Sequence, residues 1–393
     1  MAGTPRPRAR DIGLRIGLLP TGPTNSIVDV AHVTVGHATV WRDEPDPPDG
    51  RGVARTGVTV IVPHAIEDGF RYRYPAGVDV LNGAGEMTGA ATIREWGVMQ
   101  TPIFLTSTLA VGCVYDAAVA ILGESMPGSA EVFIPVVAEC DDSALSRPLP
   151  VQVSADDVRA AIVGATGQAS GPVAMGAVGA GTGMRCFELK GGIGSASRVV
   201  RPVHRWSDEA AADASAYAVG VLLLANFGEL GRLTIDGVHV GRVLRAEGWP
   251  GAGGGRERAG IRAAEGSCIG VVATDAPLSG RQLERLARRV GLGLARTGST
   301  AHHGSGEMFV AFSTGIRRPH APPAAEVEVR LVDEEYLDPF FAAVVEATEE
   351  AVVDCLFAAE TVVGRAGLII PALPIERTGE ILEAAGALRG PAG

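Results

Sequence analysis

Residues 266–274 read GSCIGVVAT, an apolar run of strand length that begins directly after a segment of opposite character. The preceding stretch, RAEGWPGAGGGRERAGIRAAEG (245–266), contains seven glycines, one proline and several charges, and it has no hydrophobic period. Such a composition cannot bury much surface, so we expect a mobile loop there. The abrupt change at Gly266-Ser267 marks a junction where a buried strand starts at a hydroxyl-bearing residue.

Two interpretations of this junction remain open from the residues alone. An ordinary boundary between a loop and a strand is one of them. The other is self-cleavage, because glycine lets the peptide bond bend toward the Ser267 hydroxyl and the loop can move away afterwards. Cleavage would leave Ser267 with a free α-amine of ordinary pKa near 8, close enough to neutrality for the amine to serve as the nucleophile's own base.

Strands and helices alternate over the rest of the chain, which predicts α/β or α+β layering. A two-residue turn at Asp236-Gly237 predicts a hairpin over 233–240, and Ser154 is expected to cap a helix. The helix at 338–359 is expected to carry its acids on an outer face. The expected strands are 26–40, 57–63, 131–139, 217–228, 267–274, 306–314 and 325–332, and the expected helices are 85–97, 109–122, 154–165, 278–298 and 338–359.

The composition narrows the class of protein. The 393 residues contain 34 basic and 45 acidic side chains, a net charge of −11 with no basic cluster, which argues against a nucleic-acid or anionic-membrane surface. No run reaches the roughly 18 to 20 apolar residues of a membrane span, and the basic N-terminus lacks the apolar core of a secretory signal. Five widely spaced cysteines without a CxxC pair fit reduced thiols. We therefore expect a cytoplasmic protein.

Neither the glycine-rich loops nor the histidines predict a cofactor or metal site. The motifs GAVGAGTG (176–183) and KGGIGS (190–195) are followed or joined by residues with strand character, whereas a dinucleotide site needs a helix there. Tight turns near a packed site are the preferred interpretation. His302 and His303 are adjacent and would point to opposite faces of a strand. Lys190 is the only lysine in the chain, which we interpret as compositional bias.

Long motifs along the chain resemble one family. They are RIGLLPTGPTNSIVDVAHVTVGH (15–37), PAGVDVLNGAGEMTGA (75–90), TPIFLTSTLAVG (101–112), FELKGGIGSASR (187–198), LLANFG (223–228), GSCIGVVATDAPL (266–278) and RQLERLARRVGLGLARTGSTAHHGSGEMFVAFST (281–314). Together they resemble the P1 family of self-processing serine aminopeptidases, peptidase family S58, whose members include the L-aminopeptidase/D-Ala-esterase/amidase and the β-aminopeptidases. The resemblance covers nearly the whole chain in order.

The resemblance implies catalytic roles for four residues. The serine of the family's Gly-Ser processing site falls on Ser267, which would be the nucleophile for self-cleavage and for acyl transfer. The second serine and the acid fall on Ser305 and Glu307, which share one face of an extended segment. The oxyanion-hole asparagine falls on Asn226, for which a turn-forming role before Gly228 is the alternative.

One further acid and two departures from the family pattern concern substrate binding. The family's acid that binds the free ammonium group of the substrate falls on Glu139, although a solvated strand end is the alternative. The family usually continues with threonine and an aromatic residue, whereas Cys140 and Asp141 follow here. His303 replaces the asparagine that is common before the GSG motif. We expect these departures to affect substrate preference more than hydrolytic chemistry.

The resemblance also implies an architecture and a set of partners. It implies a four-layer α/β/β/α sandwich, similar to the N-terminal-nucleophile hydrolases with different connectivity. Residues 1–266, with the linker 245–266, would form the α chain, and residues 267–393 would form the β chain, folded together as one unit. Homotetramers of αβ units, small peptides or aminoacyl amides and esters with a free amino group as substrates, and no metal or cofactor are expected.

Two rival functions are weighed against this one. A self-processing acyltransferase of the ornithine acetyltransferase type would use a threonine nucleophile, so Ser267 speaks against it. A non-catalytic small-molecule-binding relative would keep the fold and lose the chemistry, and the Cys140-Asp141 departure is the feature that favours it.

Overall fold

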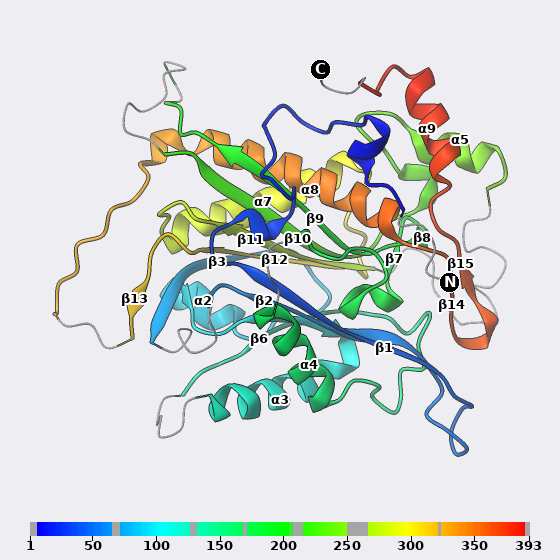
Figure 1. The fold of residues 1–393 in the computed structure, drawn as a ribbon, viewed down its shortest axis with the longest axis horizontal. Coiled ribbons are helices and arrows are strands. Elements are labelled where there is room, and N and C mark those ends of the chain that lie inside the picture. The colour runs from blue at the N-terminus through cyan, green and yellow to red at the C-terminus, as the bar shows by residue number, and fades with distance from the viewer. Residues whose placement is uncertain are drawn as a thin grey trace.

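The computed structural model describes residues 6–64, 71–125, 132–167, 171–204, 206, 215–249, 266–320 and 324–389. Two sheets form the centre of the molecule (Figure 1). The smaller has the order β1-β2-β5-β6, with bounds β1 (Thr34–Asp43), β2 (Val53–Val62), β5 (Ile103–Ser107) and β6 (Val136–Cys140). Within it β5 and β6 run parallel, whereas β1, β2 and β5 pair antiparallel.

The larger sheet has seven strands in the order β13-β3-β12-β11-β10-β9, with β4 paired to β3 outside that path. Its bounds are β3 (Tyr72–Gly83), β4 (Val98–Met99), β9 (Gly192–Val200), β10 (Tyr217–Asn226), β11 (Ser267–Thr274), β12 (Gly306–Ser313) and β13 (Arg318–Pro319). Two short ladders complete the strands: β7 (Arg185–Cys186) with β8 (Leu189–Lys190), and β14 (Val362–Val363) with β15 (Ile369–Ile370).

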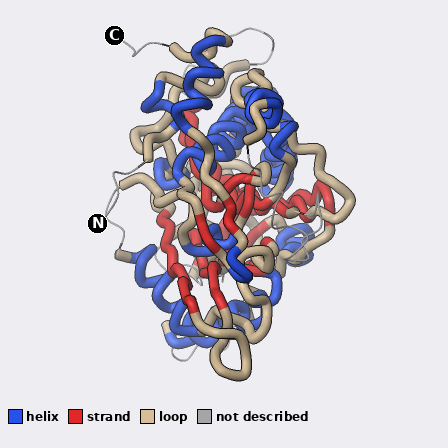
Figure 2. The backbone as a smooth tube through the Cα atoms, turned by 90° about the vertical axis from the view of Figure 1, so that its right-hand side faces the viewer, coloured by secondary structure: helices blue, strands red, loops and turns tan. Residues whose placement is uncertain are grey.

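Helices cover the outer face of each sheet, with strands between them (Figure 2). Their bounds are α2 (Ala90–Trp96), α3 (Val111–Glu124), α4 (Ala155–Thr166), α5 (Val240–Ala246), α7 (Gly280–Arg296), α8 (Asp338–Ala358) and α9 (Ile375–Ala384). None of the helices in the described ranges combines the length and apolar character needed to cross a bilayer.

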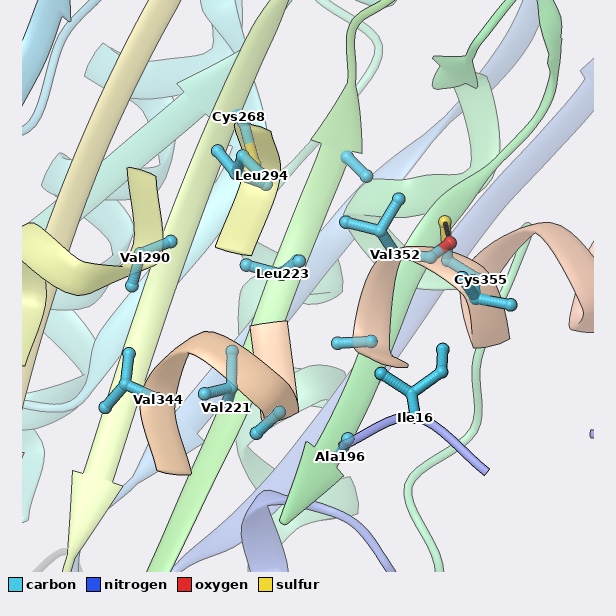
Figure 3. Close-up of a cluster of buried hydrophobic side chains, with 14 of the residues drawn as sticks. Ile16, Ala196, Val221, Leu223, Cys268, Val290, Leu294, Val344, Val352 and Cys355 are labelled. Atoms are coloured by element: carbon cyan, nitrogen blue, oxygen red, sulfur yellow. Dashed lines mark hydrogen bonds between the residues drawn. The ribbon is translucent and has the colours of Figure 1, made fainter. Parts of the chain in front are cut away.

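Three apolar cores separate four layers. One core lies between α3 and α4 and the outer face of the smaller sheet, and a second lies between the two sheets. The third joins α7 and α8 to the outer face of the larger sheet, where Val290, Val344 and Val352 surround Leu223 (Figure 3). Successive residues of β11 alternate between the second and third cores, as the pleat requires. The expected α/β/β/α sandwich is confirmed.

Strands from both sides of the Gly266-Ser267 junction interleave in the larger sheet. β11 pairs antiparallel with β10, in the register Asn226↔Ser267, and parallel with β12. β12 in turn pairs antiparallel with β3. Two strands that follow the junction therefore lie between two strands that precede it.

Several local predictions hold at the level of single residues. α4 begins with the predicted cap at Ser154, whose side chain and that of Asp157 form a capping box. α7 buries the predicted apolar face, Leu283, Leu286, Val290 and Leu294. β11 begins at Ser267, as predicted. The predicted mobile loop lies mostly outside the described residues, since 250–265 are among those left out.

Two predicted strand segments are wrong, and the predicted strand 26–40 begins only at Thr34, after a 3-10 turn at Ile27–Asp29. Asp236 and Gly237 do form a turn with positive φ values of 47° and 78°, closed by two hydrogen bonds between Ile235 and Val238. No strands extend from it, because α5 begins at Val240. The segment 325–332 has the alternation of a strand, yet within the described part of the chain it has no partner and is not a strand.

The predicted acidic outer face of α8 is also wrong, because four of its carboxylates are buried: Glu346, Glu349, Glu350 and Asp354. They face arginines of other segments. Arg198, which is fully buried on β9, donates to Glu346 Oε2 (3.0 Å) and Glu350 Oε2 (2.7 Å). The N-terminal Arg8 and Arg10 pair with Asp354 and Glu350.

Candidate active site

Ser267 lies at one end of the larger sheet, beside the two segments that the sequence analysis singled out. The register of β10 places Asn226 opposite Ser267, and the register of β12 places Gly306 opposite it on the other side. Ser305 and Glu307 flank Gly306. The pairing of β11 with β10 and β12 therefore brings these two residues, Asn226 and Ser267 to the same end of the sheet. Ser267 itself is 5% exposed.

Ser305 and Glu307 form a buried pair. The Ser305 hydroxyl donates to Glu307 Oε1, which confirms that the two side chains share a face of the strand. Burial raises the pKa of Glu307, while hydrogen bonds from Ser305 and from Asn82, its partner on β3, act in the opposite direction. The pair is therefore a hydroxyl held by an acid in a site that disfavours charge, suited to moving a proton over a short distance.

The Asn226 carboxamide is fixed at both ends. Its Oδ1 accepts from the Arg185 amide (3.0 Å), and its Nδ2 donates to the Asp141 carbonyl (2.9 Å). These contacts settle which end of the amide donates, and an Nδ2 group has a second hydrogen. Gly228 adopts a positive φ of 91° two residues later, a conformation that favours glycine, while Asn226 itself is the last residue of β10.

Glu139 is a buried carboxylate at the end of β6. It accepts from the Glu86 amide (3.0 Å) and from the Thr108 hydroxyl. Burial raises its pKa; the hydrogen bonds from Thr108 and Glu86 counter this shift. The side chain reaches the Ser305–Glu307 segment across Gly85, where a Cβ atom would lie 2.8 Å from Glu139 Oε1 and 3.9 Å from the Gly306 Cα. The solvated strand end considered as an alternative is not what the structure shows.

Cys140, the first departure from the family pattern, contacts the nucleophile candidate. Its thiol donates to the Leu224 carbonyl (3.5 Å). Burial raises the pKa of this thiol well above its ordinary value, and a hydrogen bond with Ser267 opposes the shift only partly. Cys140 thus remains a neutral thiol beside Ser267. Asp141, the other residue of this departure, exposes its carboxylate and accepts from the amide and hydroxyl of Ser143.

A cavity of about 300 Å³ lies at the carboxyl ends of the parallel strands β5 and β6, and neither Ser267 nor Glu139 is among the residues that line it. Its lining includes Thr108, Asp141, Asp142 and Arg147. Burial raises the pKa of Asp142 to about 7. The carboxyl ends of parallel strands are a usual place for small ligands. A larger cavity, described below, lies at the opposite end of β10 and β11.

Lys190 is a supporting residue that the sequence analysis missed. Its fully buried ammonium donates to the carbonyls of Gly181 (3.0 Å), Met184 (2.7 Å) and Gly191 (2.7 Å), and burial lowers its pKa to about 7. Met184 precedes Arg185, whose amide holds Asn226. The chain's only lysine beside a glycine motif was the available signal, and we interpreted it as compositional bias.

The double-sheet sandwich has Ser267 at the start of a central strand, with the Ser305–Glu307 pair, Asn226 and Glu139 nearby. This fold resembles that of the N-terminal-nucleophile hydrolases. The comparisons specify the family. The model of peptidase family S58 matches residues 25–370. The chain belongs to peptidase family S58 and is a serine aminopeptidase.

This chain matches individual relatives over nearly the whole length of both proteins. The β-peptidyl aminopeptidase BapA of Sphingosinicella microcystinivorans is 40% identical over 373 residues, which cover 94% of this chain and 90% of the relative. The β-aminopeptidase of Burkholderia sp. superimposes with a TM-score of 0.84 at 39% identity, covering 97% of this chain and 99% of that one. The L-aminopeptidase D-Ala-esterase/amidase of Ochrobactrum anthropi, described as a variant of the Ntn hydrolase fold, has a TM-score of 0.84 at 37% identity, with 98% and 100% covered.

Proposed function

We propose that this aminopeptidase cuts its own chain between Gly266 and Ser267 and then uses the freed N-terminal Ser267 to hydrolyse small peptides and aminoacyl amides or esters that have a free amino group. The observation that carries the proposal is the surroundings of the junction. The bond to be cut, the Ser305–Glu307 pair and Asn226 meet at one sheet edge, although they are far apart in the sequence.

The geometry at Gly266 favours cleavage there. Its carbonyl oxygen accepts from the Gly306 amide (3.1 Å), so the carbonyl carbon is polarised. A Cβ atom at residue 266 would lie 2.5 Å from the Asn226 carbonyl oxygen, so only glycine fits. The Ser267 hydroxyl attacks the Gly266 carbonyl and the C–N bond breaks, giving an ester. Water hydrolyses this ester, leaving a carboxylate on Gly266 and an α-amine on Ser267.

The same groups serve the substrate reaction. The α-amine of Ser267 takes the hydroxyl proton, directly or through Ser305, and the hydroxyl attacks the carbonyl of the N-terminal residue of the substrate. The second Nδ2 hydrogen of Asn226 stabilises the oxyanion, a contribution of about 3 kcal/mol in comparable sites. The leaving amine takes the proton, and water then hydrolyses the acyl-enzyme. Glu307 holds Ser305 in position throughout.

Glu139 supports the proposal that the substrates have a free amino group. A buried carboxylate that already accepts two hydrogen bonds is suited to a substrate ammonium group, which a blocked N-terminus lacks. The cavity of about 300 Å³ provides space for a small residue, and its lining includes Thr108, whose hydroxyl donates to Glu139. The names of the relatives cover β-peptidyl, L-aminoacyl and D-alanyl substrates. Intact-mass measurement followed by a panel of α-, β- and D-aminoacyl amides and esters tests the proposal. We further propose a cytoplasmic homotetramer of αβ units.

Replacing Glu139 by Gln should raise KM by about ten- to a hundredfold, because a charge-assisted hydrogen bond to the ammonium group is lost. For the unchanged enzyme, KM should rise as the pH falls through the pKa of Glu139, since only the carboxylate binds the ammonium. Burial places that rise at a higher pH than for an exposed glutamate. In Glu139→Gln this dependence should disappear. Glu86→Gln, an exposed neighbour, is the matched control and should keep KM; equal effects of both changes would contradict the role.

Replacing Lys190 by Met should lower kcat by about ten- to a hundredfold while KM stays close to its original value, because three buried carbonyls lose their donor and the loop that fixes Asn226 shifts. A double-mutant cycle with Asn226→Ala separates this positioning role from general damage. In the Asn226→Ala enzyme, Lys190→Met should have little further effect on kcat. Fully additive losses, measured well below the melting temperature, would show that Lys190 does not act through Asn226.

A further inference from the structure

An eight-residue segment, here called the arm (residues 324–331), has the sequence pattern of a strand but pairs with no strand in the part of the chain that the structure describes. Ala325, Val327, Val329 and Leu331 alternate with Glu326, Glu328 and Arg330. The arm stands away from the layers of the molecule at the left of Figure 1, where it leads from β13 to α8. Val327 is 59% and Leu331 is 47% exposed, an unusual position for residues that prefer a packed sheet face.

The arm is held at its two ends and free between them. On one side the His320 amide donates to the Arg71 carbonyl (2.9 Å). On the other side the Val332 amide donates to the Pro277 carbonyl (3.0 Å), and the Val332 carbonyl accepts from Gln282 (2.8 Å). Among the described residues, none forms a backbone hydrogen bond with residues 324–331. An extended segment held open in this way resembles an exposed sheet edge, which binds another strand readily.

There is also space for a second strand. A cavity of about 1160 Å³ separates the arm from the body of the molecule. Residues of the arm line it on one side, and Trp96, Tyr217 and Tyr336 line it on the other. Trp96 is itself 56% exposed. Apolar side chains entering from a second chain would therefore find apolar contacts.

We propose that the arm pairs with the arm of a second copy of this chain, antiparallel and about a two-fold axis centred on Val329. In that register Glu328 lies opposite Arg330 of the partner subunit in both directions, and Val327 lies opposite Leu331 of the partner subunit. Opposite charges and apolar pairs at facing positions stabilise such ladders, and a two-fold contact uses the same residues on both chains. The inference deepens the proposed assembly into homo-oligomers.

Alternative registers are less favourable on the same charges. Centring the pair on Glu328 or on Arg330 would place that residue opposite its own copy. Centring it on Val327 would place Glu326 opposite Glu328. A two-fold axis that lies between two consecutive residues would place charged residues opposite apolar ones. A parallel pair in register would place every charged residue opposite its own copy. Like charges at facing positions are destabilising.

The test is the mass of the full-length protein by light scattering and sedimentation over a range of concentrations. Glu328→Arg and Arg330→Glu should each raise the dissociation constant of the assembly about tenfold or more, because both charge pairs become repulsive. Mixing the two variants should restore the assembly, since the mixed pair again opposes unlike charges. Val329→Asp should disrupt it regardless of mixing, because two carboxylates would meet at the axis.

Glu326→Arg is the matched control. It changes the net charge by the same amount as Glu328→Arg, but in this register residue 326 faces Val332 of the partner subunit, so the assembly should be unchanged. A monomeric starting protein, equal weakening by Glu326→Arg, or no recovery on mixing would overturn the proposal. Hydrolysis is measured separately on the same samples, so an inactive enzyme that still assembles through the arm would count against the proposed function alone.

Discussion

Ser267→Ala should migrate as one chain of 40.4 kDa on a denaturing gel, whereas the unchanged protein should give fragments of 266 and 127 residues (393 − 266). The hydroxyl that attacks the Gly266 carbonyl is absent in the variant, so no ester forms. Hydrolysis of aminoacyl p-nitroanilides should fall by on the order of a millionfold, as expected when a covalent nucleophile is removed. Gel analysis and intact mass, followed by the kinetic assay, check both results.

Gly266→Ala is the companion variant, because it keeps the nucleophile and changes only the fit of the bond to be cut. A methyl group there would lie 2.5 Å from the Asn226 carbonyl oxygen, so the chain should be cut much more slowly. As fragments appear slowly, the hydrolytic activity should increase in proportion to the fraction of the chain that has been cut. Two fragments from Ser267→Ala, or turnover by that variant, would remove Ser267 from the mechanism.

Arg198→Ala should lower the free energy of unfolding by about 3 to 5 kcal/mol, the usual cost of leaving buried carboxylates without their counter-charge. Arg198 is fully buried and also donates to the Ile16 carbonyl (2.7 Å), so its loss affects the N-terminal segment as well as α8. Burial works to raise the pKa of Glu350, but the hydrogen bond from Arg10 and the charge of Arg198 outweigh it and hold that pKa below its usual value.

Denaturant unfolding measures this change most clearly in the Ser267→Ala background, where a single polypeptide unfolds. Arg159→Ala provides the comparison, because Arg159 pairs with Glu124 at 2.9 Å on the surface, where such pairs contribute less than about 1 kcal/mol. If both variants unfolded at the same denaturant concentration, the buried network would not be a main source of stability.

Short-range patterns in the sequence predicted several single elements well, whereas the four layers followed from the family resemblance. Ser154, the apolar face of α7 and the start of β11 at Ser267 depend on spacing and composition within a few residues. The resemblance then indicated Asn226, Ser305 and Glu307, and the strand registers bring them together. Their roles in catalysis stay predictions, and of the three residues Asn226 is the one that a variant above changes.

Long-range pairing explains what the sequence could not predict. In the sequence, the carboxylates of α8 have the pattern of a solvated face. The arginines that pair with them in the fold, Arg8, Arg10 and Arg198, come from distant segments. The partners of Lys190 are backbone carbonyls of a folded loop, which no pattern of nearby side chains indicates. The alternation of 325–332 predicted a strand that the structure does not form, because no local rule says whether an extended segment finds a partner within its own chain.

The interleaving of β11 and β12 between β10 and β3 has a consequence for the order of events in the cell. Two separate pieces would have to meet by diffusion and thread central strands into a sheet that cannot close without them. A continuous chain keeps the pieces together at a high effective concentration while the sheet forms. Once the strands have paired and the ion pairs of α8 have formed, the peptide bond between Gly266 and Ser267 is no longer needed to hold the two parts together. Cleavage before folding should therefore prevent assembly, whereas cleavage after folding should leave the two fragments associated.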